Sequence, residues 1–376
     1  MMTQNNGTTE NKSLAVAKRA NRQNKRIIRY RRTNTILIIV IVILLFYIAF
    51  EKGGGSTTGS GITAASTTTT QTTIPAPPNY LWVTLPNENA IQAVQFATGT
   101  DNTPPIAVGK TPVDIVPDPT GIQLYVVDEG SDAISVVSLY SYSTYKTIKV
   151  GLRPTKMVLS QATAMAYILD SGSGQITPLN LNGLVVGHPF NAGPGPSSLA
   201  ISNDGKTLFV SDAGNNTVLP INVTTDNVKA MSPIRVGSNP QKEVLDMTTG
   251  TAIAVANEGS NSVSLISTTG LSVLATINTP GPPSDISFAA NGATAYITVP
   301  SLEEIIPFSM FDATTSKPIL VNGHPNLIIA GLNKTFLFVV DTGDTTTWYI
   351  DSSEQLPPQV LPINQVISSV VIPVVT

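Results

Sequence analysis

The sequence predicts an all-β, seven-bladed β-propeller preceded by one transmembrane helix. Three observations carry this prediction: a phrase that recurs about every 42 residues, an uncharged apolar block near the N-terminus, and a C-terminal apolar segment in phase with the repeats. So regular a period is typical of repeat architectures. Its length and its short strand-like runs indicate one four-stranded propeller blade per repeat.

The repeated phrase is Val-Gly, a gap, Pro, an apolar stretch, a polar turn, an aromatic-Val-x-Asp strand and a small-polar loop. Its prolines are spaced by 42, 42, 44, 43 and 42 residues and are Pro112, Pro154, Pro196, Pro240, Pro283 and Pro325. In the second repeat we expect strands over residues 154–160, 166–170, 175–181 and 188–192, because β-branched and aromatic residues fill these runs and turn residues separate them. The glycines between blades, such as Gly109 and Gly151, are expected to supply positive φ.

A partial repeat precedes the first full one. Residues 80–84, 90–96 and 106–109 align with the second, third and fourth strands of a blade, and no first strand comes before them. The missing strand is predicted at the C-terminus, over residues 366–372, which occupy the place of a first strand. Such a strand completes the first blade and closes the ring, which removes the open sheet edges.

The N-terminal region predicts a membrane anchor. Residues 1–32 carry nine Lys/Arg and one acid, and 18 uncharged residues then separate Arg32 from Glu51. At about 1.5 Å per residue this stretch spans roughly 27 Å, close to the thickness of a bilayer core. We therefore predict a transmembrane helix over residues 33–50, with the tail 1–32 in the cytoplasm by the positive-inside rule. A cleaved signal peptide and a buried core helix are the alternatives.

The composition divides the rest of the chain into two parts. Residues 51–79 are rich in Gly, Ser, Thr and then Pro, so they predict a flexible tether. Residues 80–376 are predicted to form the propeller. The segment 53–376 holds 11 Lys/Arg and 22 Asp/Glu, and this acidic balance argues against nucleic-acid binding. There is no cysteine, which excludes disulfides and thiolate chemistry.

Two segments carry a resemblance to a known family: VGLRPTKMVLSQATAMAYILDSGSGQI and AGPGPSSLAISNDGKTLFVSDAGNNTV. They are similar to the YVTN family of surface-layer-type β-propeller repeats, whose relatives include lactonase-like and streptogramin-lyase-like propellers. The resemblance covers residues 80–372 and departs most at Val299-Pro300-Ser301-Leu302, where the Asp-x-Gly loop is absent. It implies a propeller fold and, in many members, export from the cell. It implies little about activity, because propellers host unrelated functions.

Two sets of loops are expected to share one face around the channel of such a propeller, and ligands or partners usually meet that face. One set joins the second and third strands of a blade, and the other connects one blade to the next. The predicted ligand or partner residues on these loops are Asp128, Glu129, Asp132, Asp170, Asp212, Glu258, His324, Asp341, Asp344, Lys110 and Arg153. The channel mouth should therefore be acidic. The alternative is that the aspartates are turn formers that bond their own backbone.

The sequence predicts no catalytic residue, no metal site and no cofactor. Carboxylates suit Ca²⁺, but no Asp-x-Asp-x-Asp-Gly loop is present, so a shared ion would have to lie in the channel. His188 and His324 should be too far apart to share a metal. His324 is the single histidine on the expected ligand face, where a general base or a solvated side chain would both fit.

These observations favour a membrane-anchored, extracytoplasmic propeller that acts as a recognition or scaffolding module at the cell surface, with a protein or cell-surface partner. One alternative is an exported lactonase- or lyase-like enzyme that uses the acidic channel face. Another is a solute- or ion-binding sensor, although the short basic tail leaves no room for an output domain.

Overall fold

The computed structural model describes residues 80–95, 103–224, 228–246, 248–289, 291–330, 336–343, 345–351, 358–361, 363 and 365–371. They belong to one compact unit, Thr72–Thr376. The tail 1–32, the span predicted over residues 33–50, the tether 51–79 and Asp344 lie outside these residues. Among the residues described, no helix is both long and apolar enough to span a membrane.

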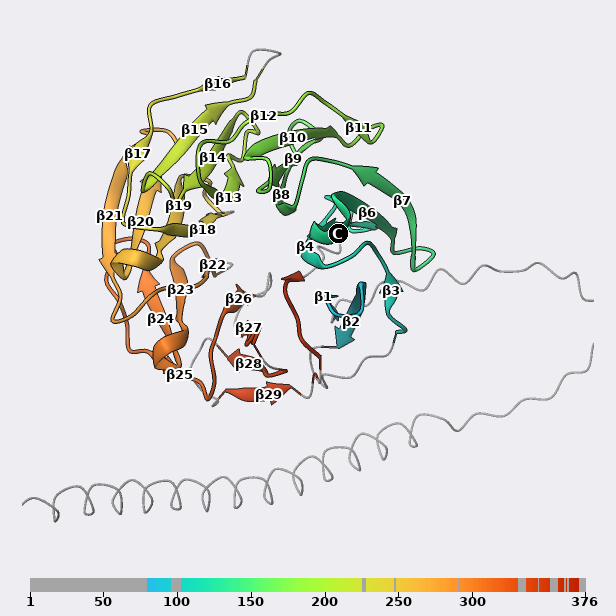
Figure 1. Ribbon diagram of the computed structural model, residues 1–376. Coiled ribbons are helices and arrows are strands. Elements are labelled where there is room, and N and C mark those ends of the chain that lie inside the picture. The colour runs from blue at the N-terminus through green and yellow to red at the C-terminus, as the bar shows by residue number, and fades with distance from the viewer. Residues whose placement is uncertain are drawn as a thin grey trace, which may run out of the picture. The chain divides into compact units, whose positions relative to one another are not determined.

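The described strands form seven antiparallel sheets arranged around a ring, as the sequence predicts (Figure 1). We name these sheets blades A to G in chain order. Blade A holds β1 (Tyr80–Leu85), β2 (Ala90–Gln95), β3 (Ile106–Ala107) and β30 (Val370–Val371). Blade B holds β4 (Pro112–Pro117), β5 (Gln123–Asp128), β6 (Ala133–Ser138) and β7 (Ser143–Lys149).

Blades C and D divide their outer strand into two short pieces. Blade C holds β8 (Pro154–Ser160), β9 (Met165–Asp170), β10 (Gln175–Asn180), β11 (Val185–Val186) and β12 (Phe190–Asn191). Blade D holds β13 (Pro196–Ile201), β14 (Thr207–Asp212), β15 (Thr217–Asn222), β16 (Lys229–Ala230) and β17 (Ile234–Arg235). In each blade both outer pieces pair with the third strand. The outer strand predicted over residues 188–192 is therefore shorter than expected. Pro178 in β10 accepts a hydrogen bond from the N–H of Gly187 but has no N–H to donate in return, so the ladder breaks between β11 and β12.

The last three blades have one described outer strand each. Blade E holds β18 (Pro240–Leu245), β19 (Ala252–Asn257), β20 (Ser262–Ser267) and β21 (Val273–Asn278). Blade F holds β22 (Ile286–Phe288), β23 (Thr294–Val299), β24 (Glu304–Ser309) and β25 (Ile319–Leu320). Blade G holds β26 (Leu327–Ala330), β27 (Phe336–Val340), β28 (Thr347–Asp351) and β29 (Gln359–Leu361). Short 3-10 helices follow the second strands of blades B, E and F: η1 (Glu129–Ser131), η2 (Glu258–Ser260) and η3 (Pro300–Leu302).

The second strand of each blade is mostly hydrophobic because neighbouring blades cover both of its faces. In β5, Leu124 and Val126 pack toward blade A, and Tyr125 and Val127 pack toward blade C. Successive side chains of a strand point to opposite faces, so one strand contributes to two cores. An apolar cluster of this kind fills each of the seven interfaces between neighbouring blades, the interface between blades G and A included.

The two tryptophans pack between sheets. Trp82 lies in the core between blades A and B, and Trp348 lies in the core between blades F and G. Their blades are neighbours, yet each ring faces away from the other blade. The two rings therefore stabilise different interfaces.

The C-terminal segment completes blade A, which confirms the predicted closure. β30 pairs with β1 through Trp82↔Val371 and Val83↔Val370. Thr84 extends this contact, because its N–H donates to the carbonyl of Ser369 and its hydroxyl lies 2.8 Å from that of Ser368. The strand is shorter than the predicted residues 366–372. Closure thus rests on a few ladder bonds and on threonine and serine hydroxyls.

Candidate functional site

The two loop sets do share one face, which we call the mouth face. In blade B the N–H groups of Glu129 and Gly130 donate to the carbonyls of Thr111 and Lys110 on the preceding connection. Equivalent bonds recur in the next blade, and in blades D and E the loop residues Ala213 and Glu258 donate in the same way. These bonds hold each loop against the connection that enters its blade, so the face is built of clamped rather than free loops.

The strand-end aspartates on this face are buried. Asp128 ends β5 and Asp170 ends β9, and both side chains are fully excluded from solvent. Asp128 Oδ2 accepts a hydrogen bond of 2.6 Å from Ser135 Oγ, and Asp170 Oδ2 accepts one from Thr177 Oγ1. Burial raises the pKa of both carboxyl groups to about 6, since a charge loses its hydration there. These two groups therefore do not form an acidic surface at the mouth.

Blade E has an amide at the same position, which shows what this position requires. Asn257 ends β19 and its Nδ2 donates to Ser264 Oγ at 2.9 Å, again seven residues further along the chain. The carboxyl oxygen of blade B accepts where the amide of blade E donates. The common requirement is a hydrogen bond between the second and third strands, so neither a negative charge nor an exposed ligand group is needed.

The glycines between blades lie in close contact with the buried residue at the strand end. A Cβ on Gly109 would lie 2.5 Å from Asp128 Oδ2, and one on Gly151 would overlap Asp170 in the same way. The prediction that the glycines between blades supply positive φ is confirmed at Gly193 and Gly323. It is wrong at Gly109 and Gly151, where the positive φ falls two residues later, at Thr111 and Arg153. A side chain is excluded here because the connection crosses directly over the carboxyl group.

Asp212 and Asp341 are also nearly buried, and they do bond their local backbone. Asp212 Oδ1 accepts from the N–H of Asn215 at 3.2 Å. Asp341 Oδ1 accepts from Gly343, and its Oδ2 accepts from the N–H of His324 at 2.9 Å. These bonds match the turn-former interpretation.

The exposed groups of the mouth face form small separate pairs. Arg153, whose side chain is 69% exposed, bonds Glu129 at 2.7 Å, and its N–H donates to Asp132. Glu258 accepts from Asn239 Nδ2 at 3.1 Å. Lys110 is exposed in blade B. Of the predicted site residues, the structure thus brings together Glu129, Asp132 and Arg153 in one group, and His324 with Asp341 in another.

His324 lies on the mouth face beside Asp341, with 3.5 Å between Nδ1 and Oδ2. Its side chain is mostly exposed while the carboxyl is buried. Within the described part of the chain, no group of three His, Cys, Asp or Glu side chains is placed to hold a metal ion.

Sequence reasoning missed a set of charged groups on the inner strands. We call it the inner belt, and it consists of Asp114, Lys156, Lys242, Glu243 and Asp285. These residues lie on or directly before the strands next to the centre of the ring: β4, β8, β18 and β22 (Figure 1). The inner strands of neighbouring blades contact one another, so the belt bridges blades.

Asp114 connects three blades. Its Oδ1 lies 3.1 Å from Lys156 Nζ, its Oδ2 accepts from the N–H of Met157, and Ser369 Oγ donates to it at 3.3 Å. The carboxylate of blade B therefore holds blade C and the closing segment of blade A. Buried charges are found in proteins when they are paired and hydrogen-bonded in this way.

Asp285 connects blades E, F and G in the same way. Its Oδ2 accepts from the N–H of Ile328 at 3.1 Å, and its Oδ1 lies 3.7 Å from Lys242 Nζ. The attraction of Asp285 is the largest influence on Lys242; it raises the pKa of this lysine despite the opposing loss of hydration, and Asp114 adds to the rise. The two ion pairs of the belt thus influence one another.

Glu243 is the belt carboxyl group whose burial is offset by the fewest polar contacts. It is almost fully buried, Oε2 accepts from Ser211 Oγ, and no described residue bonds Oε1. Burial raises its pKa to about 8, although the hydrogen bond from Ser211 and the charge of Lys156 oppose the rise. Buried groups with strongly shifted pKa values concentrate at functional sites, and they also occur in structural networks.

The sequence does contain a signal for the belt. Asp114, Lys156, Lys242 and Asp285 each stand two residues after a repeat proline, at the start of the first strand of a blade. In blades B, C and E the strand register shifts between the proline and this residue, which is the mark of a β-bulge. Bulges turn a side chain toward a new neighbour, here the next blade.

Comparison with known proteins adds a family match and a set of shared folds. The family model described as lactonase, seven-bladed β-propeller, matches residues 85–276. No curated protein matches the chain. All the solved structures described next are under 25% identical to this chain, so these likenesses show the fold alone.

Three solved structures illustrate that fold. A hydrazine synthase structure from Kuenenia stuttgartiensis is 21% identical with a TM-score of 0.63, covering 77% of this chain and 99% of that one. A functionally unknown protein from Desulfotomaculum acetoxidans is 14% identical with a TM-score of 0.68, covering 78% and 98%. A candidate 6-phosphogluconolactonase from Bacteroides fragilis is 16% identical with a TM-score of 0.64, covering 78% and 97%.

Proposed function

Given that this chain belongs to the lactonase family of seven-bladed β-propellers, we propose that its ring is a recognition module held outside the cell by residues 33–50. The mouth face is the binding surface, and its partner is a protein or another component of the cell surface. The resemblance to surface-layer-type repeats is part of the same proposal.

The triad of Glu129, Asp132 and Arg153, with its exposed arginine, is the observation that carries the proposal. Glu129 holds the guanidinium of Arg153 and Asp132 holds its backbone N–H, while most of the arginine side chain is exposed to solvent. Arginine is enriched in protein interfaces, and a side chain that is already oriented loses less entropy on binding. The clamped loops beneath it favour binding without rearrangement.

The recognition proposal is tested by charge reversal on the two faces of the ring. Arg153→Glu and Glu258→Lys alter the mouth face, and Lys206→Glu alters an exposed lysine on the turn between β13 and β14, at the opposite face. The full chain in detergent is used to capture partners from membranes of the producing cell. We expect the mouth variants to lose a partner that Lys206→Glu retains. Equal capture by all variants would place the binding surface elsewhere.

The membrane topology is tested with cysteine labelling, which is clean here because the natural chain has no cysteine. Lys206→Cys should react with a membrane-impermeant maleimide in intact cells. Lys12→Cys should react only after the cells are permeabilised. The opposite labelling pattern would contradict the proposed topology.

Glu243 favours one second candidate, the hydrolysis of a lactone. In that reaction water adds to the ring carbonyl, the bond from the carbonyl carbon to the ring oxygen breaks, and a hydroxy acid forms. Because burial raises the pKa of Glu243 to about 8, its carboxyl is protonated at neutral pH and can donate to the departing ring oxygen. Lys156 and Lys242 can stabilise the negative charge that develops on the carbonyl oxygen.

Acid release measured by pH-stat decides between the candidates. The substrates are glucono-δ-lactone and 6-phosphogluconolactone, and the protein is the full chain. Enzyme activity predicts release well above the spontaneous rate and a fall of about 10²-fold or more in Glu243→Gln with folding unchanged. Release at the spontaneous rate with both substrates would leave recognition as the function.

A further inference from the structure

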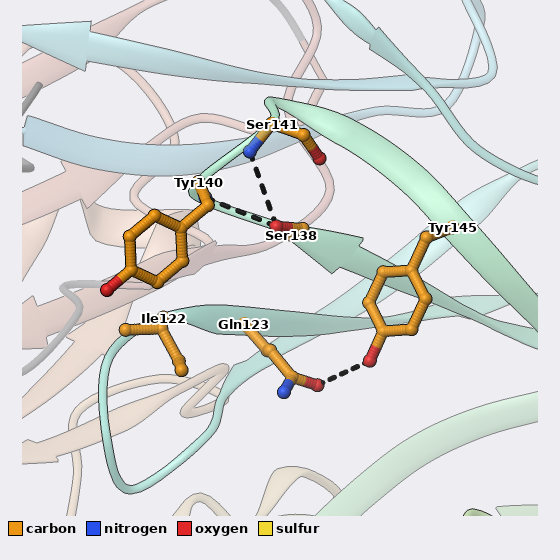
Figure 2. A pocket seen from close by; sticks show the side chains of 6 residues that line it. All are labelled: Ile122, Gln123, Ser138, Tyr140, Ser141 and Tyr145. Atoms are coloured by element: carbon orange, nitrogen blue, oxygen red, sulfur yellow. Dashed lines mark hydrogen bonds between the residues drawn. The ribbon is translucent and has the colours of Figure 1, made fainter. Parts of the chain in front are cut away.

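A hollow lies on the side of blade B opposite the mouth face, and nothing in the proposed function uses it. It has a volume of about 320 Å³ and is lined by Ile122, Gln123, Ser138, Tyr140, Ser141 and Tyr145. Ile122 ends the turn between β4 and β5, and Tyr140 and Ser141 lie on the turn between β6 and β7. Figure 2 shows the two tyrosine rings on opposite sides, with Gln123 between them and Ile122 beside Tyr140.

The lining is fixed by hydrogen bonds before any ligand arrives. Asp118 Oδ1 accepts from the N–H groups of Ile122 and Gln123, both at 2.9 Å. Ser138 Oγ accepts from the N–H groups of Tyr140 and Ser141 at 3.2 and 3.3 Å. These bonds set the positions of both turns, so the hollow does not have to be assembled on binding.

Aromatic and aliphatic side chains of the hollow are exposed to solvent and do not pack into a core between blades. Tyr140 is 70% exposed, Tyr145 is 52% exposed, and Ile122 is also exposed. Large side chains exposed together, and in a concave site, are a sign of a binding surface. Tyrosine offers broad apolar area and a hydroxyl at low entropic cost.

The polar groups of the hollow are neutral and directional. Tyr145 OH donates to Gln123 Oε1 at 2.8 Å, which fixes the amide (Figure 2). No described residue accepts a hydrogen bond from Gln123 Nε2. Two amide hydrogens are therefore available next to the rings. None of the six lining side chains carries a charge at neutral pH.

We propose that this hollow binds a neutral sugar, as a free saccharide or as one unit of a glycan. A pyranose ring has an apolar face of C–H groups and an edge of hydroxyls. The faces of Tyr140 and Tyr145 match the first, and Gln123 Nε2 and the serine hydroxyls match the second. The uncharged lining disfavours sugar phosphates and uronic acids, whose charge would lose hydration without a partner.

The ring has a built-in control for this proposal. Phe311 occupies the equivalent turn of blade F, where Ser309 Oγ accepts its N–H at 3.2 Å, and its side chain is 97% exposed. Phe311 therefore repeats the exposed aromatic of Tyr140 in the same local structure. Phe311 is not among the residues that line the hollow of blade B.

The experiment is saturation-transfer difference NMR on the full chain in a detergent without sugar groups. The probes are neutral oligosaccharides of glucose, mannose and N-acetylglucosamine, and galacturonate oligosaccharides serve as the charged comparison. We expect transfer from at least one neutral probe and weaker transfer from the charged one. Tyr140→Ala and Gln123→Ala should each lower the affinity about tenfold or more. Tyr140→Trp and Phe311→Ala should keep it.

Three results would overturn the proposal. The first is the absence of saturation transfer for every neutral probe, and the second is an equal effect of Tyr140→Ala and Phe311→Ala. The third is that a proline-rich peptide binds in a way that requires Tyr140 while the sugars do not, since exposed aromatics also bind polyproline segments. Circular dichroism of each variant separates loss of binding from loss of folding.

Discussion

The strand-end carboxylates and the inner-belt carboxylates are buried to a similar degree, but they depend on different partners. Asp128 and Asp170 receive a single side-chain hydrogen bond each, from a hydroxyl of their own blade. Asp114 and Asp285 receive a lysine and a backbone N–H from neighbouring blades. The first set organises a blade and tolerates neutrality, whereas the second set joins blades and needs its charge.

Blade E already contains the neutral form of the first set, because Asn257 stands where blade B has Asp128. Among the described charged inner-strand residues, Asp114 and Asp285 both face a lysine. The difference teaches that burial alone does not identify a functional carboxylate. A carboxyl group keeps its charge where a lysine and a backbone N–H contact it. Glu243 is intermediate between the two sets, because only one of its oxygens accepts a hydrogen bond from a described residue.

The largest expected effect comes from removing one inner-belt partner. Asp285→Ala leaves the partly buried Lys242 ammonium and the buried Ile328 N–H without their acceptor. We expect a loss of about 3–5 kcal/mol in the free energy of unfolding, as for other broken buried pairs. Urea unfolding followed by tryptophan fluorescence measures it. A loss below about 1 kcal/mol would show that the belt does not join blades.

The strand-end carboxyl groups should instead make the stability of the fold depend on pH. The unfolded chain releases the protons of Asp128 and Asp170 near their usual pKa of 3.8, and the folded chain holds them to about 6. Their contribution to stability therefore falls as pH rises from about 4 to 6 and is constant above that range. Two units of pKa correspond to at most about 3 kcal/mol for each group.

The control for this effect is the double variant Asp128→Asn with Asp170→Asn. Thermal unfolding between pH 4 and 7 should show the wild type losing stability relative to this variant as pH rises. Parallel curves for the two proteins would mean that these carboxyl groups ionise normally in the fold.

A smaller loss of stability is expected from a side chain at Gly109, where the connection between blades A and B crosses the end of β5. Gly109→Ala places a methyl group 2.5 Å from Asp128 Oδ2, so the loop or the carboxyl must shift. We expect a cost of about 1–3 kcal/mol, typical of overpacking. Asp128→Ala in the same chain should reduce that cost by making room. Gly183→Ala, whose Cβ meets only Val185 at 3.3 Å, is the matched control in chemical unfolding.

The smallest effect belongs to the exposed pair of the mouth face. Arg153→Ala removes the contact with Glu129, but the arginine is mostly solvated, so the free energy of unfolding should change by about 0.2–1 kcal/mol. The same unfolding assay measures it. A change as large as that of Asp285→Ala would make Arg153 a structural residue and would weaken its assignment to recognition.

Much of the architecture was predictable because the repeat marks the strands that neighbouring blades cover on both faces. The prolines Pro112 and Pro154 begin β4 and β8 as expected. The C-terminal segment pairs with β1, since an unpaired edge beside Trp82 and Val83 would leave backbone groups and apolar surface exposed. The shared face of the two loop sets follows from the antiparallel order of the strands.

The candidate site was much less predictable. Asp128 and Asp170 read as surface turn residues because the chain around them is small and polar, yet the connection that carries Gly109 or Gly151 covers them. Asp285 and Lys242 are 43 residues apart and meet only because consecutive blades pack face to face. The position two residues after a repeat proline marks Lys242 and Asp285 in the sequence, but it does not show which side chains meet across blades.

By itself, the sequence determined the period, the strands and the closure of the ring. Each follows from apolar residues that must be covered on both faces and from turn residues at regular intervals. The tertiary structure alone decided which polar groups lose water and which keep it. That outcome depends on the approach of neighbouring blades and connections, and it separates the buried Asp128 from the exposed Arg153 and from the hollow between Tyr140 and Tyr145.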